Sequence, residues 1–359
     1  MSRFLSSRLK HLEPYTPGEQ PQMRDLIKLN TNESPFPPSE NAIKMAVEAA
    51  GSLQLYPDPE CRKLTEILAK NLGVNNDELL LTNGSDEILN FAFMAFCDGE
   101  RGAVFPDITY GFYKVFADLN GVPYREIPLN KDFGINFGDY VDLNETIFIA
   151  NPNAPTGIYY EIEQIEEIIK NNQNSIVVVD EAYVDFGNKS CVPLIKKYDN
   201  LLVTRTFSKS RSMAGARLGY GVGCRELIRD LNTIKYSTNP YNINSLTMAA
   251  GIGSIADDTY FKDRCRKVCE VREYVKDKLS QMGFEMTDSR ANFIFTRHNK
   301  ISGEELYTKL REKNIIVRHF DKERISDYNR ITIGTREQMD KLLCAVSDIL
   351  SDILKEDNK

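Results

Sequence analysis

The sequence predicts an α/β protein with a mostly parallel sheet flanked by helices, followed by a smaller α/β domain. Five short apolar runs have the length of buried strands and lie at residues 79–81, 103–105, 146–150, 176–179 and 201–204. Helix-like segments separate most of these runs, at residues 86–97, 110–120 and 161–171. Such alternation is typical of βαβ units, in which helices cover both faces of a parallel sheet.

The chain is predicted to divide into three parts. Residues 1–38 contain two Pro-rich clusters and little helical periodicity, which indicates an extended arm. Residues 39–240 form the predicted large domain, which carries the alternating strands and helices. A turn-rich stretch precedes the predicted small domain, residues 241–359. That domain is expected to hold a long helical region, then alternating strands and helices, at residues 245–282, 292–296, 303–313, 315–317, 330–333 and 336–354.

Composition and charge exclude several classes of protein. The 359 residues carry a formal net charge of -7, so no basic surface for nucleic acid or for acidic membranes is expected. No apolar stretch approaches the ~20 residues that cross a bilayer, and no signal peptide is expected. Seven cysteines without repeated spacing, with only three histidines, favour reduced thiols over a zinc site. We therefore expect a cytoplasmic protein without a metal.

Lys209 follows the apolar run 201–204 and lies close to the hydroxyl side chains of Thr206 and Ser208. Ligands of parallel sheets bind beyond the carboxyl ends of the strands. The amine of Lys209 can form an imine with an aldehyde, while the two hydroxyls and Arg217 can donate to a phosphate. Considered alone, Lys209 is equally well explained as a solvated lysine after a strand.

A second polar group, Asp180, stands where the apolar run 176–179 ends. A carboxylate at this place can keep a pyridine nitrogen protonated, which strengthens the ring as an electron sink. Tyr183, three residues later, can donate to the phenolic oxygen of the same ring. An aspartate that caps a helix is the alternative explanation.

Two further strand ends carry candidate ligand groups. Ser85 and Asp86 open a helix after the run 79–81, and its first N–H groups can form a phosphate cup. Both residues can equally be ordinary helix caps. Tyr110, just after the run 103–105, can stack on a planar ring, although a core tyrosine is the more common outcome. Together, the amine, the carboxylate, the phosphate cup and the aromatic ring fit pyridoxal 5'-phosphate (PLP).

These motifs resemble those of the fold-type I PLP aminotransferases, and the complete set resembles the histidinol-phosphate aminotransferases. The resemblance covers nearly the whole chain and is carried by residues 12–18, 28–35, 56–59, 83–87, 151–157, 180–183, 205–209, 214–220 and 330–334. It implies the fold of that group. It also implies transamination between histidinol phosphate and 2-oxoglutarate, a reaction of histidine biosynthesis.

The resemblance implies a role for each candidate residue. Lys209 would carry PLP as a Schiff base and then move the substrate proton. Asp180 would pair with the pyridine nitrogen, Tyr183 would face the phenolic oxygen, and Tyr110 would stack on the ring. Tyr56 would reach the cofactor phosphate from a neighbouring subunit, so the active site would require a homodimer. The same phosphate would be surrounded by Ser85, Asp86, Thr206, Ser208 and Arg217.

On the substrate side, the resemblance implies that Arg330, Arg318 and Tyr15 bind the phosphate of histidinol phosphate. An arginine fork binds a carboxylate or a phosphate equally well, so Arg330 alone does not select the substrate. The alternative for Arg318 is an exposed residue of an edge strand.

One position departs from the family pattern. Ala154 stands where the family usually has an asparagine that donates to the phenolic oxygen of the cofactor. A buried oxygen that loses one donor of this kind costs ~1–3 kcal/mol. Either Tyr183 makes that contact, alone or with a water, or Asn153 reaches around to it.

Other functions share parts of this pattern. An aromatic amino-acid aminotransferase or a threonine-phosphate decarboxylase would have the same scaffold. A PLP-binding regulator would carry a helix-turn-helix module before the arm, and this chain starts almost directly with the arm. A nicotinamide-dependent dehydrogenase is a poor fit because no G-x-G-x-x-G follows a strand and opens a helix.

Overall fold

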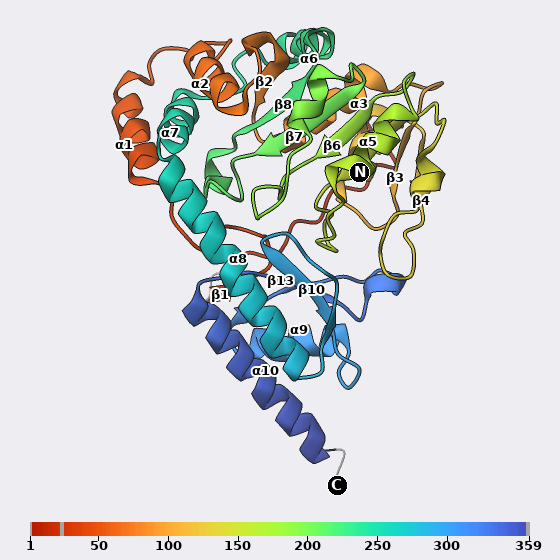
Figure 1. Cartoon of the computed structure of the whole chain (residues 1–359), viewed down its shortest axis with the longest axis vertical. Helices are drawn as coiled ribbons and strands as arrows, with labels where there is room; N and C mark the ends of the chain where they lie inside the picture. The colour runs from red at the N-terminus through yellow and green to blue at the C-terminus, as the bar shows by residue number, and fades with distance from the viewer. Residues whose placement is uncertain (1, 22–24, 357–359) are drawn as a thin grey trace.

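The computed structural model describes residues 2–21 and 25–356. Its centre is a seven-stranded sheet with the strand order β2-β8-β7-β6-β5-β3-β4 (Figure 1). Only β8 is antiparallel to its neighbours within this sheet. The predicted α/β fold with a mostly parallel sheet is therefore confirmed. The strands are β2 (Leu79–Thr82), β3 (Ala103–Pro106), β4 (Tyr124–Ile127), β5 (Thr146–Ala150), β6 (Val177–Asp180), β7 (Leu201–Thr206) and β8 (Gly219–Gly223).

Helices cover both faces of this sheet because its central strands are apolar on both sides. Val178 packs on one face with α3, α4 and α6, whereas Val177 and Val179 pack on the other face with α2 and α5. The sequence did not predict β4, because this edge strand is largely exposed and lacks an apolar run. The helices are α2 (Arg62–Leu72), α3 (Ser85–Phe96), α4 (Phe112–Asn120), α5 (Ile162–Lys170) and α6 (Arg225–Thr238).

The predicted long helical region at 245–282 consists of two helices. They are α7 (Ser245–Ala256) and α8 (Asp258–Gln281), and the backbone of Asp257 leaves the helical conformation between them, with φ -95° and ψ 49°. α7 packs against α1 (Glu40–Ala49). α8 continues from α7 toward the second sheet, so it links the two halves of the molecule (Figure 1).

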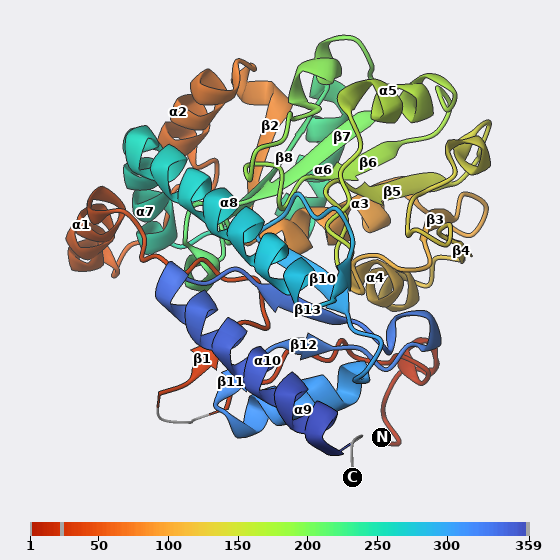
Figure 2. The same ribbon diagram turned by 60° about the horizontal axis from the view of Figure 1, so that its bottom comes forward.

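The C-terminal part forms a smaller sheet of four antiparallel strands in the order β12-β13-β10-β9. α8 and α10 lie side by side against this part (Figure 2). The elements are β9 (Glu285–Met286), β10 (Phe293–Arg297), α9 (Gly303–Glu312), β11 (Ile315–Ile316), β12 (Arg318–His319), β13 (Asn329–Thr332) and α10 (Arg336–Glu356).

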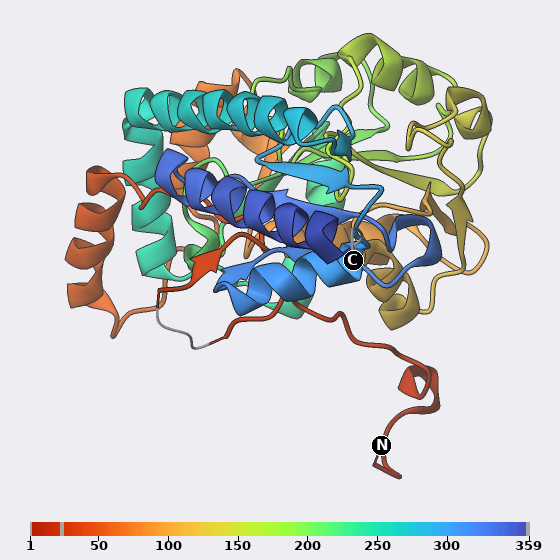
Figure 3. The same ribbon diagram turned by 90° about the horizontal axis from the view of Figure 1, so that it is seen from below.

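The N-terminal arm joins this smaller part. Its short strand β1 (Ile27–Lys28) pairs in parallel with β11. Farther back along the arm, the Glu19 carboxylate accepts a hydrogen bond of 2.6 Å from the hydroxyl of Tyr307 in α9. Figure 3 shows the N-terminal end extending away from the body of the molecule. The domain boundaries at residues 38 and 240 stay predictions.

Candidate active site

The carboxyl ends of the central strands surround one cavity. Every predicted cofactor residue except Tyr56 lines it. The chain brings them together because β2, β3, β6 and β7 each end at this edge of the sheet, and the loops that follow carry the polar side chains. The lining residues are Ser85, Asp86, Tyr110, Ala150, Pro152, Ala154, Asp180, Ala182, Tyr183, Thr206, Ser208, Lys209 and Arg217.

Lys209 lies three residues beyond β7, and its amine points into this cavity. The Nζ atom donates a hydrogen bond of 3.1 Å to the backbone carbonyl of Thr31. Removal of the amine from water lowers the pKa of Lys209 to about 8, and the positive charge of Arg330 adds to this effect. At pH 7 roughly a tenth of the amine is therefore neutral, and hence nucleophilic, a far larger share than for a lysine in water.

The lowered pKa predicts how Lys209 reacts in the cofactor-free protein. Acetylation of its amine is expected to rise with pH to a midpoint near pH 8, because only the neutral amine attacks the reagent. Arg330→Gln should move this midpoint upward, because it removes a positive charge that disfavours protonation. Mass spectrometry of the Lys209 peptide after short labelling at a series of pH values measures both midpoints. An unchanged midpoint in the variant would contradict the assigned charge effect.

Asp180 is the last residue of β6 and is buried, with an exposed fraction of 4%. Its carboxylate accepts hydrogen bonds from the hydroxyls of Tyr113, at 3.1 Å, and Thr204, at 3.2 Å. Burial raises the pKa of Asp180 to about 6, although these hydrogen bonds act in the opposite direction. A cation in the cavity, such as a protonated ring nitrogen, would therefore find a poorly solvated carboxylate in a fixed position.

A group of donors gathers at the start of α3. The Thr206 hydroxyl donates to the Ser208 hydroxyl at 2.9 Å, and Arg217 Nη1 lies 3.4 Å from the same Ser208 oxygen. The Asp86 carboxylate is already engaged, because it accepts from Tyr110 at 2.6 Å and from Arg217 at 2.8 Å. Asp86 can therefore contribute only its backbone N–H, at the start of α3, to the binding of an anion. A cation, hydroxyls and a helix N-terminus together suit a phosphate.

Two glycines permit this close packing. A Cβ on Gly84, whose φ is +78°, would lie 2.5 Å from Arg217 Nη2. A Cβ on Gly219 would lie 2.4 Å from the backbone of Gly84 and Ser85. Any side chain at either position would therefore push β8 or Arg217 away from the start of α3.

The wall of the cavity near Ala154 lacks the amide that the family pattern would place there. Asn153 does not replace it, because its amide donates to the Ile108 carbonyl and the Thr156 hydroxyl, each at 3.0 Å. Its side-chain oxygen accepts from Thr109 at 2.8 Å. The Asn153 side chain is thus fully engaged outside the cavity. Of the two options left by the sequence, Tyr183 is the one whose side chain faces the cavity.

A second cavity, of about 320 Å³, adjoins the first and shares Tyr110, Ala154, Tyr183 and Lys209 with it. The predicted substrate residues Tyr15, Arg318 and Arg330 all line this cavity. Arg330 Nη2 donates to the carbonyl of Asn30 at 2.9 Å, but its buried Nε finds no acceptor within residues 2–21 and 25–356. A buried guanidinium with an unused N–H is suited to an anionic ligand.

Tyr15 is held over this second cavity by the arm. Its ring stacks on Phe112 with 4.3 Å between ring centroids. Arg318 Nη2 lies 3.5 Å from the carbonyl of Thr16, the next residue of the arm. The sequence did not single out Lys322, which also lines the cavity, because the residues around it contain no recognisable motif.

Known proteins are similar to this chain along almost its entire length. Residues 24–346 match the family described as aminotransferase class I and II. A histidinol-phosphate aminotransferase from Brachyspira hyodysenteriae is 51% identical over 342 residues, which cover 95% of this chain and 97% of the relative. The chain belongs to the histidinol-phosphate aminotransferase family. The resemblance predicted from the sequence is thereby confirmed.

Other members of the family agree with this assignment. The histidinol-phosphate aminotransferase of Lactococcus lactis subsp. cremoris is 45% identical over 345 residues, covering 96% of this aminotransferase and 97% of the relative. The crystal structure of the histidinol-phosphate aminotransferase from Clostridium acetobutylicum superimposes with a TM-score of 0.83 at 25% identity. That superposition covers 91% of this chain and 100% of the other.

Tyr56 is the predicted cofactor residue that lies away from the cavity of this aminotransferase. Its side chain is 83% exposed and stacks on Tyr241, with 4.7 Å between ring centroids. Val47, Leu53 and Leu55 are also exposed on the neighbouring segment. Tyr56 therefore belongs to an apolar surface and not to the site of its own chain.

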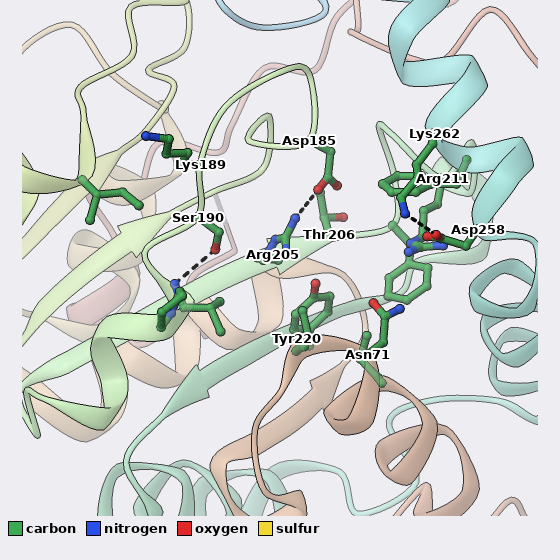
Figure 4. A pocket seen from close by; sticks show the side chains of 17 residues that line it. Asn71, Asp185, Lys189, Ser190, Arg205, Thr206, Arg211, Tyr220, Asp258 and Lys262 are labelled. Atoms are coloured by element: carbon green, nitrogen blue, oxygen red, sulfur yellow. Dashed lines mark hydrogen bonds and ion pairs between the residues drawn. The ribbon is translucent and has the colours of Figure 1, made fainter.

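A larger cavity, of about 630 Å³, shares only Thr206 with the first cavity (Figure 4). Its charged groups are largely paired with one another. Arg205 pairs with Asp185, and Lys262 lies 2.6 Å from Asp258. Its size alone does not make it the active site, because it contains neither Lys209 nor Asp180. No helix within residues 2–21 and 25–356 is long and apolar enough to span a membrane.

Proposed function

We propose that the protein is a PLP-dependent aminotransferase that moves the amino group of histidinol phosphate to 2-oxoglutarate in histidine biosynthesis. The observation that carries this proposal is the continuity of two cavities across Lys209 and Tyr183. One cavity offers a phosphate cup and a buried carboxylate, and the other offers two arginines. The names of the close relatives support the same substrate. The seven free cysteines support the reducing cytoplasm as its location.

The residues of the first cavity fit PLP. Arg217, Ser208 and the start of α3 would hold its phosphate, in the cradle that Gly84 and Gly219 leave open. Asp180 would hold the pyridine nitrogen in its protonated form, and Tyr110 would lie against the ring. When bound, PLP supplies an electron sink for the charge that develops at the substrate carbon.

Lys209 would have two tasks in the reaction. Its amine would hold the cofactor at the aldehyde carbon, for which the pKa near 8 supplies a neutral nucleophile. After the substrate amine has displaced it, Lys209 Nζ would take the proton from the substrate carbon and return it at the former aldehyde carbon. The hydrogen bond to Thr31 keeps Nζ at the junction of the two cavities.

The substrate phosphate would bind in the second cavity between Arg330 and Arg318, with Tyr15 closing over it. Arg330→Gln is expected to lower kcat/KM for histidinol phosphate by about 10²–10³-fold, because a buried charged partner of the phosphate is lost. The measurement is the initial rate of glutamate formation with saturating 2-oxoglutarate. Arg229→Gln, at an exposed arginine outside both cavities, is the control.

The substrate itself provides a second control. Histidinol, which lacks the phosphate, should react slowly with the wild type and lose little further rate in Arg330→Gln. A wild type that prefers aromatic amino acids over histidinol phosphate would overturn the proposed substrate. Release of carbon dioxide without any need for 2-oxoglutarate would instead identify a decarboxylase.

We also propose that two copies of the chain form the working enzyme, with Tyr56 completing the partner's phosphate cup. The exposed apolar surface around Tyr56, Val47, Leu53 and Leu55 supports this arrangement. Tyr56→Ala should weaken cofactor binding by about 1 kcal/mol, the contribution of one hydrogen bond.

Mixing two variants at a limiting PLP concentration, at which Tyr56→Ala is largely empty, tests this contact. Refolding Tyr56→Ala together with Lys209→Ala should then raise the activity, because one site of the mixed dimer has both an intact Lys209 and an intact Tyr56. If the mixture stays at the sum of the separate activities while mixed dimers are present, Tyr56 does not act across the interface.

A further inference from the structure

A single stretch of the arm, residues 30–32, contacts three groups of the site. The Asn30 carbonyl accepts from Arg330 at 2.9 Å, and the Thr31 carbonyl accepts from Lys209 at 3.1 Å. The Asn32 side-chain amide donates to the hydroxyl of Tyr183 at 3.0 Å. Neither carbonyl contact depends on the identity of the arm residue. The contact of Asn32 does depend on its side chain. Of these three contacts, it is therefore the one that a substitution in the arm can remove.

Thr332 and Asn292 hold Asn32 on the side away from Tyr183. Asn32 is 1% exposed, and its backbone adopts the left-handed conformation, with φ 55°. The Thr332 hydroxyl accepts from the Asn32 backbone N–H and donates to the Asn32 side-chain oxygen, each at 3.0 Å. Asn292 donates to the Asn32 carbonyl at 3.0 Å. In this orientation the side-chain oxygen of Asn32 faces Thr332, and its NH₂ group faces Tyr183.

This orientation determines the direction of the Tyr183 hydroxyl. Because the oxygen of Tyr183 accepts a hydrogen bond from Asn32, its own proton must point elsewhere. Within residues 2–21 and 25–356 that proton has no acceptor, and the side chain lines both cavities. The hydroxyl is therefore set as a donor into the site.

No other side chain on this wall can do the same. Ala150, Pro152, Ala154 and Ala182 form the rest of it, and none carries a polar side chain. The hydroxyl of Tyr110 is engaged by Asp86 at the opposite end of the cavity. If the Tyr183 hydroxyl pointed its proton away from the cavity, this wall would have no side-chain donor among its lining residues.

We propose that Asn32 is a positioning residue that holds Tyr183 as the hydroxyl donor to the phenolic oxygen of the bound cofactor. The inference rests on the proposed use of PLP. Asn32 does not line the first cavity, and would act by keeping the Tyr183 proton directed into it. A donor at this oxygen stabilises the negative charge that remains there when the neighbouring nitrogen loses its proton.

The test is the pH midpoint of the visible absorbance of the PLP-loaded protein. The charged groups facing Tyr183 are Arg330, Asp180 and Lys209, and none is altered in the variants. Asn32→Ala frees the hydroxyl and should raise the midpoint by up to about one pH unit, the equivalent of one hydrogen bond. Tyr183→Phe should raise it by at least as much.

The double variant separates positioning from a general structural effect. In the Tyr183→Phe background, Asn32→Ala should leave the midpoint unchanged, because no hydroxyl remains to be directed. Adding Ala154→Asn to Asn32→Ala should lower the midpoint again, because it restores an amide donor to the same wall. If Asn32→Ala does not fold, Asn32→Asp keeps the shape and left-handed preference of asparagine. It should raise the midpoint more in the presence of Tyr183 than in its absence.

Several results would overturn the inference. An equal rise caused by Asn32→Ala in both backgrounds would show that Asn32 does not act through Tyr183. An unchanged midpoint in Asn32→Ala would show that Asn32 has no influence on the absorbance of the bound cofactor. If the wild type binds no PLP, the proposed function fails and the inference fails with it. If the wild type shows the absorbance and transaminates while Asn32 has no effect, only the inference fails.

Discussion

Replacing Lys209 by alanine is expected to remove both the visible absorbance of PLP-loaded protein and the transaminase activity. Within residues 2–21 and 25–356, Lys209 is the only lysine that lines the first cavity, and Lys322 lines only the second. The rate with histidinol phosphate should fall by at least about 10⁴-fold, because covalent attachment and proton transfer are lost together.

Two controls separate chemistry from charge and from folding in this experiment. Lys209→Arg keeps a positive charge but cannot form the covalent bond, so it should be as inactive as the alanine variant. Lys189→Ala changes an exposed lysine outside both of these cavities and should retain the absorbance. Absorbance that persists in Lys209→Ala would assign the cofactor to another amine.

Asp180→Asn should have the second largest effect on the reaction. Asparagine cannot keep the pyridine nitrogen protonated, so the ring becomes a weaker electron sink. We expect kcat to fall by about 10³-fold, equivalent to ~4 kcal/mol of activation free energy. The amide should still accept from Tyr113 or Thr204, which keeps the change local. Single-turnover kinetics with histidinol phosphate measure the loss in the proton-transfer step.

The same substitution should stabilise the cofactor-free protein. The pKa of Asp180 is raised from 3.8 to about 6 in the folded state, so the folded protein binds the proton more tightly than the unfolded chain. This contribution to the free energy of unfolding falls as pH rises from about 4 to about 6 and stays low above that range. Asp180→Asn removes this penalty, a gain of about 1–3 kcal/mol at pH 8.

Urea unfolding of the cofactor-free protein at pH 8 and pH 4 measures this gain. The variant should be more stable than the wild type at pH 8, and nearly equal to it at pH 4, where the folded carboxyl is protonated and the unfolded one is roughly half protonated. A variant that is less stable at pH 8 would show that the lost hydrogen bonds outweigh the buried charge. Activity and stability would then move together, and not in opposite directions.

Site residues could be predicted from the sequence where they directly follow a buried strand. Lys209, Asp180 and Ser85 each follow an apolar run, and parallel strands gather such ends at one edge of the sheet. Tyr113 and Thr204 could not be predicted, because their contacts with Asp180 depend on how α4 and β7 pack against β6. The roles of all these residues stay predictions until the variants are measured.

The same distinction applies to the fold. Buried central strands can be predicted because they are continuous apolar runs. The strands β1 and β4 lie at sheet edges and are not such runs. The break between α7 and α8 was not predicted because no glycine or proline lies within three residues of Asp257 to end a helix there. Asn32 is the clearest case, since its partners Tyr183 and Thr332 come from two distant parts of the chain.

The contacts between the arm and β13 join residues 300 positions apart, both for Asn32 with Thr332 and for Arg330 with Asn30. During synthesis on the ribosome, the phosphate cup and Lys209 emerge long before Arg330 and Thr332 do. A nascent or truncated chain that ends before β13 therefore contains the residues of the first cavity but lacks Arg330, the buried cation of the second. Its Asn32 also lacks the hydroxyl that orients it, so the complete site is a property of the finished chain only.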